Sequence, residues 1–130
     1  MKRPSIFLLA ALSTPTVANA GETLKPEWET LKFECEIKET FVCEAGAACR
    51  ALPVEVWNLV DMARSSYARC NDARGCDNYD ARVSYSGYFV NIDVPGRGIT
   101  ATVSKGGAFH EVATILHSVL VSFGTCKRTS

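Results

Sequence analysis

The stretch Val94-Pro-Gly-Arg-Gly-Ile-Thr-Ala-Thr-Val-Ser-Lys-Gly-Gly-Ala-Phe-His-Glu-Val-Ala-Thr-Ile115 decides the fold class. Residues 94–98 supply proline and glycine in the order that a type II turn requires. Residues 105–108 supply the two glycines typical of a tight hairpin loop. Between these turns, residues 99–104 alternate apolar and polar side chains, as a half-buried strand does. The stretch therefore predicts two consecutive antiparallel hairpins.

Strand-like sequence continues on both sides of this stretch. Residues 79–93 are rich in Tyr, Val, Phe and Ile, and in residues 118–123 two valines and a phenylalanine occupy alternate positions. We expect a mainly β domain, a small antiparallel meander or barrel of about seven or eight strands stapled by disulfides, with room for one short helix.

Two segments also fit helical spacing. Residues 109–120 have apolar side chains at intervals of three and four, but we favour strands there because β-branched residues are frequent and glycines flank the segment. Residues 54–63 follow Pro53 and have one apolar stripe at helical spacing, so a helix remains an open alternative there.

Residues 1–20 have the features of a secretory signal peptide. Lys2 and Arg3 precede a short apolar run over residues 6–12, and Ala18-Asn-Ala20 provides the small residues that precede a cleavage site. The apolar run is too short to span a bilayer. We predict cleavage after Ala20 and a periplasmic or secreted protein.

Removing residues 1–20 would leave 110 residues with 12 basic and 14 acidic side chains. We divide them into a polar N-terminal arm over residues 21–30 and a single disulfide-stabilised β domain over residues 31–130. The small net charge offers no footprint for nucleic acid, and no later apolar run approaches the ~18 residues of a membrane span. We therefore expect neither nucleic-acid binding nor a membrane span. The sequence does not determine the oligomeric state.

The six cysteines are expected to form disulfides, because their number is even and the exported compartment is oxidising. Cys43 and Cys49 enclose five residues that include a glycine, and so do Cys70 and Cys76, so both pairs can close local loops. This would leave Cys35 to join Cys126. The favoured pairing is one of several that the sequence permits.

The sequence contains no recognisable catalytic or cofactor-binding constellation. His110 and His117 are seven residues apart, whereas a zinc-protease helix needs a spacing of four. A Gly-x-Ser-x-Gly elbow and a glycine-rich phosphate loop are also missing from the sequence. We therefore predict no catalytic residue, no metal site and no cofactor, and a protein that binds another protein rather than an enzyme.

Residues 71–80 are rich in Asn and Asp, but their spacing does not match an EF-hand calcium loop. We interpret the segment as a disulfide-pinned turn whose side chains cap their own backbone. Arg74 lies inside this turn, where a disulfide would hold it towards solvent, as in the contact loop of an inhibitor. It is a candidate partner-binding residue.

Three short motifs resemble, in order, those of the bacterial periplasmic inhibitors of c-type lysozyme. They are Phe33-Glu-Cys35, Ser84-Tyr-Ser-Gly-Tyr88 and Ser104-Lys-Gly-Gly107, followed by Cys126. The resemblance implies an eight-stranded barrel with a Cys35–Cys126 bridge. It also implies an inhibitory face that includes Ser86 and Lys105, with a lysozyme or another hydrolase as the partner. This chain differs from the family in having four further cysteines.

Three functional hypotheses follow for an exported, non-catalytic binding protein of unassigned partner. The first is an inhibitor of a c-type lysozyme or another hydrolase, acting through Ser86 and Lys105. The second is an envelope structural or interaction protein that presents an aromatic patch around Trp28 or Trp57. The third is a carrier whose barrel mouth holds a small apolar ligand.

Overall fold

The computed structural model describes residues 27–129. The signal peptide predicted for residues 1–20 and most of the predicted N-terminal arm lie outside this range. The arm's last residues, Glu27–Thr30, form the short 3-10 helix η1. No helix within the described range is long and apolar enough to cross a membrane.

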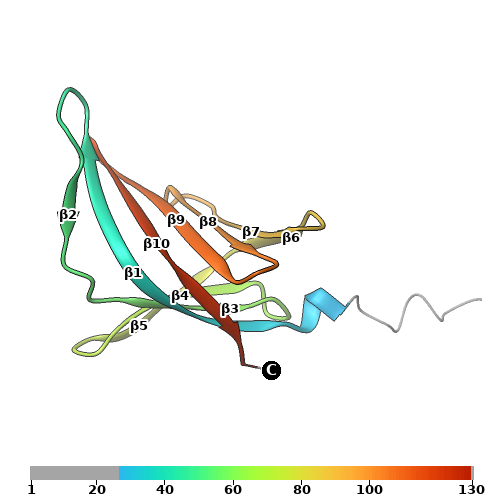
Figure 1. The fold of residues 1–130 in the computed structure, drawn as a ribbon. Helices are drawn as coiled ribbons and strands as arrows, with labels where there is room; N and C mark the ends of the chain where they lie inside the picture. The colour runs from blue at the N-terminus through green and yellow to red at the C-terminus, as the bar shows by residue number, and fades with distance from the viewer. Residues whose placement is uncertain (1–26, 130) are drawn as a thin grey trace, which may run out of the picture.

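Ten strands follow η1 along the chain (Figure 1). They are β1 (Lys32–Glu44), β2 (Arg50–Leu52), β3 (Trp57–Asp61), β4 (Ser66–Asn71), β5 (Gly75–Asp80), β6 (Arg82–Tyr85), β7 (Phe89–Val94), β8 (Ile99–Ser104), β9 (Ala108–Ile115) and β10 (Ser118–Arg128). Residues 54–63 and 109–120 contain strands, so the helical alternative for residues 54–63 is wrong. The physical reason is the burial pattern of β3, where Asn58 and Val60 are buried while Leu59 between them is exposed. This alternation has the two-residue period of a strand and not the period of a helix.

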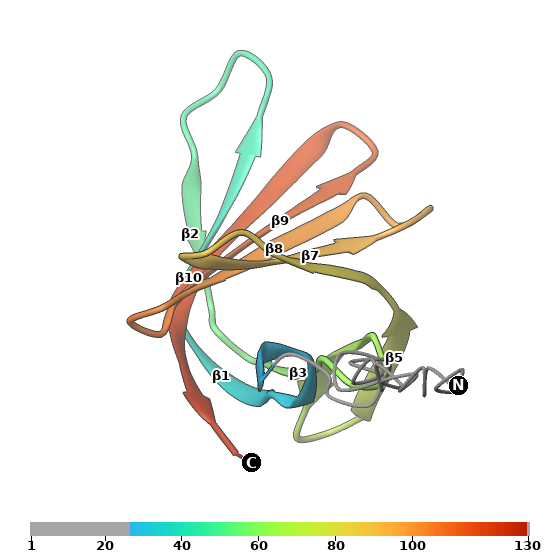
Figure 2. The same cartoon turned by 90° about the vertical axis from the view of Figure 1, so that its right-hand side faces the viewer.

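The strands form one antiparallel, nearly closed barrel, which confirms the predicted fold class (Figure 2). The order around the sheet is β5-β4-β3-β1-β10-β9-β8-β7-β6, and β2 pairs only with β1, outside this path. The edge strands β5 and β6 are separated only by Ala81, so the chain passes directly from one edge of the sheet to the other. The sheet has ten strands and not the expected seven or eight, for two reasons. β2 is a short additional strand, and residues 75–85 form two strands, β5 and β6, because the chain bends at Ala81.

Both predicted turns are present. The amide of Arg97 donates to the carbonyl of Val94, and Gly96 has a φ of 77°, as the third position of a type II turn requires. Gly107 donates to Ser104 and closes the loop between β8 and β9. The turns set the register of three strands, which pairs the inward-facing Val90 with Val103 and Ile92 with Ala101.

The core fills the barrel with side chains from alternate positions of these strands. The buried apolar residues form one cluster, made up of Cys35, Ile37, Val60, Met62, Tyr67, Val90, Ile92, Val94, Ile99, Ala101, Val103, Phe109 and Ala113. Aliphatic residues dominate β7 and β8, while β3, β4 and β9 add polar side chains to the same interior.

The three disulfides are the pairs favoured by the sequence. Cys35 of β1 is joined to Cys126 of β10, which lies opposite it in register. Cys70 and Cys76 are likewise opposite one another in the β4–β5 hairpin. The bond between Cys43 and Cys49 closes the loop that connects β1 to β2.

The seam between β1 and β10 also depends on a glycine. The register shifts between Ile37 and Glu39, where β1 forms a bulge, and Gly124 lies opposite Ile37. A Cβ atom at Gly124 would overlap the backbone carbonyl oxygen of Glu36. The two strands can therefore approach closely at the bulge only because position 124 has no side chain.

The disulfides are expected to contribute unequally to stability. The Cys35→Ala/Cys126→Ala variant should lose about 4–5 kcal/mol of unfolding free energy, and the Cys43→Ala/Cys49→Ala variant about 2–2.5 kcal/mol. The difference arises because the first bond closes a loop over a sequence separation of 91 and the second over a separation of 6. Guanidinium unfolding under non-reducing conditions would measure both losses, and equal losses would contradict the expectation.

Candidate binding site

Ser86 and Lys105 lie at the same end of the barrel, on adjacent loops. Ser86 begins the β6–β7 loop and Lys105 begins the β8–β9 loop. The backbone amide of Lys105 donates to the carbonyl of Tyr88 at 2.8 Å, so the two loops are joined directly. The fold thus brings together the two residues that the resemblance implicates.

The β6–β7 loop is held by its own hydrogen bonds. The Ser86 amide donates to the Phe89 carbonyl at 2.9 Å, and the Tyr85 hydroxyl donates to the Gly87 carbonyl at 2.7 Å. The Ser86 hydroxyl accepts a hydrogen bond from Asn91 Nδ2 at 3.1 Å. The position of the Ser86 hydroxyl is therefore fixed by the loop itself.

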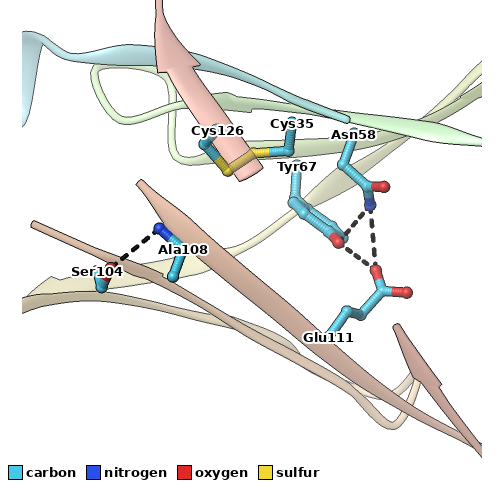
Figure 3. The surroundings of a disulfide bond; sticks show 7 residues. All are labelled: Cys35, Asn58, Tyr67, Ser104, Ala108, Glu111 and Cys126. Atoms are coloured by element: carbon cyan, nitrogen blue, oxygen red, sulfur yellow. Dashed lines mark hydrogen bonds between the residues drawn. A yellow bond between two sulfur atoms is a disulfide. The ribbon is translucent and has the colours of Figure 1, made fainter. Parts of the chain in front are cut away.

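The β8–β9 loop is anchored to the strand that carries the core disulfide. The Cys126 amide donates to the Gly107 carbonyl at 2.7 Å, and the Ala108 amide donates to Ser104 Oγ at 3.0 Å (Figure 3). Gly107 has a φ of 87°, and a Cβ atom there would lie 2.7 Å from the Cys126 carbonyl oxygen. Only glycine fits this position without strain.

The Lys105 side chain is exposed on this anchored loop and makes no hydrogen bond or ion pair with any other residue of the described range. Exposed aromatic side chains belong to the neighbouring β6–β7 hairpin: Tyr88 is 71% exposed, and Tyr85 and Phe89 are also exposed. A free ammonium near exposed rings on an ordered loop is suited to binding a partner's carboxylate, because the loop backbone loses little conformational entropy on contact. The sequence did not predict a role in binding for these aromatic residues.

Arg74 lies away from this site. It occupies the β4–β5 hairpin, which in Figure 1 points to the opposite side of the molecule from the β6–β7 hairpin. The amide of Arg74 donates to the Asn71 carbonyl, and Asn71 Oδ1 accepts from the Ala73 amide, so the turn caps its own backbone as the sequence predicted. Arg74 is exposed but cannot act together with Ser86 and Lys105.

Of the two tryptophan candidates, only Trp57 has a described side chain. Trp57 is half-buried on β3. Trp28 lies in η1, and its side chain is outside the described part of the structure. Within residues 27–129, no group of three or more His, Cys, Asp or Glu side chains is arranged to hold a metal ion.

A buried polar network was missed by the sequence analysis. Glu111 of β9 is only 2% exposed, and its carboxylate accepts hydrogen bonds from the Tyr67 hydroxyl and from Asn58 Nδ2 (Figure 3). Asn58 also donates to the Tyr67 oxygen, and Arg69 Nη2 lies 3.5 Å from Glu111 Oε1. The network links β3, β4 and β9 across the interior of the barrel.

The network compensates a charge that would be costly to bury alone. The signal that could have revealed it is strand alternation, because Glu111 lies between Phe109 and Ala113 on the inward face of β9. Burial, and then the neighbouring Glu111 carboxylate, raises the pKa of the Tyr67 hydroxyl well above its usual range. Tyr67 is thus a proton-bearing donor in the folded protein.

A scan against protein-family models, a search of curated proteins and a search of solved structures each find nothing that matches this chain. A function can therefore be inferred only from the chain's own residues and from the resemblance of its short motifs.

Replacing Tyr67 by Phe tests the network at alkaline pH. The unfolded chain releases the Tyr67 proton near pH 10, whereas the folded protein retains it because its pKa is raised. Above about pH 10, the wild-type free energy of unfolding should therefore fall by up to about 1.4 kcal/mol per pH unit more steeply than that of Tyr67→Phe. Below that pH the two curves should run parallel.

Urea unfolding at several pH values between about 8 and 11 would measure this difference. Tyr88→Phe, which removes a phenol from an exposed position, is the matched control. If wild type and Tyr67→Phe kept the same slope above pH 10, Tyr67 would not be the protonated donor of the network.

Proposed function

We propose that this protein is an exported, non-catalytic binding protein whose contact surface is formed by the β6–β7 and β8–β9 loops. Its proposed partner is a c-type lysozyme or a related hydrolase, which it inhibits. The observation that carries the proposal is the juxtaposition of Ser86 and Lys105 through the hydrogen bond between the Lys105 amide and the Tyr88 carbonyl. The motifs that resemble those of lysozyme inhibitors are thereby adjacent in space as well as ordered in sequence.

The chemistry of such a partner suits this surface. Glycosidases of this kind cleave between two carboxyl groups that face each other in a cleft. The exposed Lys105 ammonium is a strong, charge-assisted donor for a carboxylate. The Ser86 hydroxyl, which accepts from Asn91, retains its own hydrogen for a second acceptor or for the Phe89 carbonyl, 3.4 Å away. Lys105 is therefore the principal contact, and Ser86 is the supporting one.

The rigidity of the loops also favours an inhibitor. Hydrogen bonds to Cys126 and Tyr88 fix the backbone on both sides of Lys105, and the Cys35–Cys126 bond holds the strand behind it. A preorganised loop binds more tightly because less freedom is lost on association. Three disulfides also suit an oxidising compartment, where a hydrolase of the cell envelope would be met.

The test is hydrolysis of peptidoglycan by a c-type lysozyme, with the processed and oxidised protein titrated in. Lys105→Ala should weaken inhibition more than tenfold, or by about 1.4 kcal/mol, because it removes the charged donor. Ser86→Ala should weaken it less, since the loop keeps its backbone bonds. Lys38→Ala, on the exposed surface of β1, should leave inhibition unchanged.

Absence of inhibition at high molar excess of the wild-type protein would reject a lysozyme as the partner. Equal losses for Lys105→Ala and Lys38→Ala would reject the proposed contact surface. Either result would favour the alternative of an envelope interaction protein, for which a co-purified partner would be the next measurement.

A further inference from the structure

A pocket of about 370 Å³ opens at the barrel end that carries Lys105. Its inner wall includes Val90 and Val103, which belong to the buried core, and its outer wall includes Leu31, Phe33, Tyr85 and Tyr88. These residues come from three separated parts of the sequence. The pocket is therefore a partly open mouth of the barrel, and its volume lies within the usual range for small-molecule sites.

The charged side chains that line this mouth are all basic. Apart from the apolar and aromatic side chains, its lining consists of Ser104, Lys105 and Arg128, and no acidic residue of the described range lines it. The Lys105 ammonium has no partner within residues 27–129. An apolar cavity with the unpaired Lys105 ammonium at its rim and no acidic side chain in its described lining suits an anion that carries an apolar tail.

We propose that this mouth binds a small amphiphilic anion, an alkyl carboxylate in its simplest form. The alkyl tail lies against Val90, Val103 and Phe33, and the carboxylate is bound by Lys105. Burial of the tail supplies the attraction, and the charge of the rim supplies the selectivity. The binding itself does not depend on the proposed inhibition of a hydrolase.

One consequence does rest on the proposed function. Lys105 is both the proposed contact for a hydrolase carboxylate and the group that would bind the ligand's carboxylate. A bound alkyl carboxylate should therefore compete with the hydrolase and reduce inhibition.

Isothermal titration of octanoate into the processed, oxidised protein tests the pocket, with octanol and octylammonium as probes of equal chain length. Octanoate should bind at least tenfold more tightly than octylammonium. Lys105→Gln should weaken octanoate binding about tenfold and leave octanol binding unchanged. Lys38→Gln, the control for loss of a surface lysine, should bind octanoate as the wild type does.

Backbone amide shifts provide an independent readout of location. Octanoate should shift the amide signals of Tyr88, Val103 and Lys105, which border the mouth, and not that of Arg74 in the opposite hairpin. Equal affinity for octanoate and octylammonium, undetectable binding, or shifts confined to other parts of the barrel would each overturn the proposal.

Octanoate binding is measured without a lysozyme, and lysozyme inhibition is measured without octanoate, so failure of one proposal leaves the other intact. If both hold, octanoate should relieve the inhibition by the wild-type protein at concentrations that saturate the pocket. Full inhibition at saturation would show that the pocket and the hydrolase contact are separate.

Discussion

The pairing of β1 with β10 is the constraint on which the rest of the structure depends. It is the longest ladder in the barrel, and it joins the first strand to the last. The Cys35–Cys126 bond locks this ladder across a sequence separation of 91, and Gly124 lets the strands approach at the bulge. Because Gly107 accepts a hydrogen bond from Cys126, the loop that presents Lys105 is positioned by the same ladder. Barrel closure and site geometry thus share one set of contacts.

The buried polar network constrains the register of a different part of the barrel, where β9 faces β3 and β4 across the interior. A slip of one residue along β9 would move Glu111 to the outer face and bring His110 inward, away from Tyr67 and Asn58. A slip of two residues would keep the apolar side chains of β9 inward, and a purely aliphatic interior would tolerate it, because apolar side chains of similar size can exchange places. Here such a slip would still separate Glu111 from its hydrogen-bond donors. The carboxylate therefore helps to fix the position of β9 relative to β3 and β4, with which β9 is not paired in the sheet, although burying it opposes stability.

Local signals in the sequence account for most of the fold. Turns in the structure correspond to Pro95 and to the glycines at residues 94–98 and 105–108. Its strands correspond to the alternation of apolar side chains, and its disulfides to the spacing of the cysteines. The bend at Ala81 left no comparable signal, because it depends on strands distant in sequence. The accessory strand β2 left none because its three residues, Arg50–Leu52, are too few for an alternating pattern. The same holds for the site: short motifs indicated Ser86 and Lys105, whereas the mouth beside them combines Leu31, Val90 and Val103, which only barrel closure brings together.

The two ends of the barrel differ in a way that favours the Lys105 end for binding. The opposite end presents the Arg74 turn and the β9–β10 turn, in which Leu116 is 92% exposed with a φ of 49°. Within residues 27–129, no hydrogen bond joins these two turns, whereas the β6–β7 loop is bonded to the β8–β9 loop and the β8–β9 loop to β10. With fourteen basic and fourteen acidic residues in the whole sequence, long-range steering is weak, so affinity must come from short-range contacts on a surface that is already ordered. The end that carries Lys105 meets this requirement because its cation, its aromatic rings and its apolar mouth are held by one connected backbone.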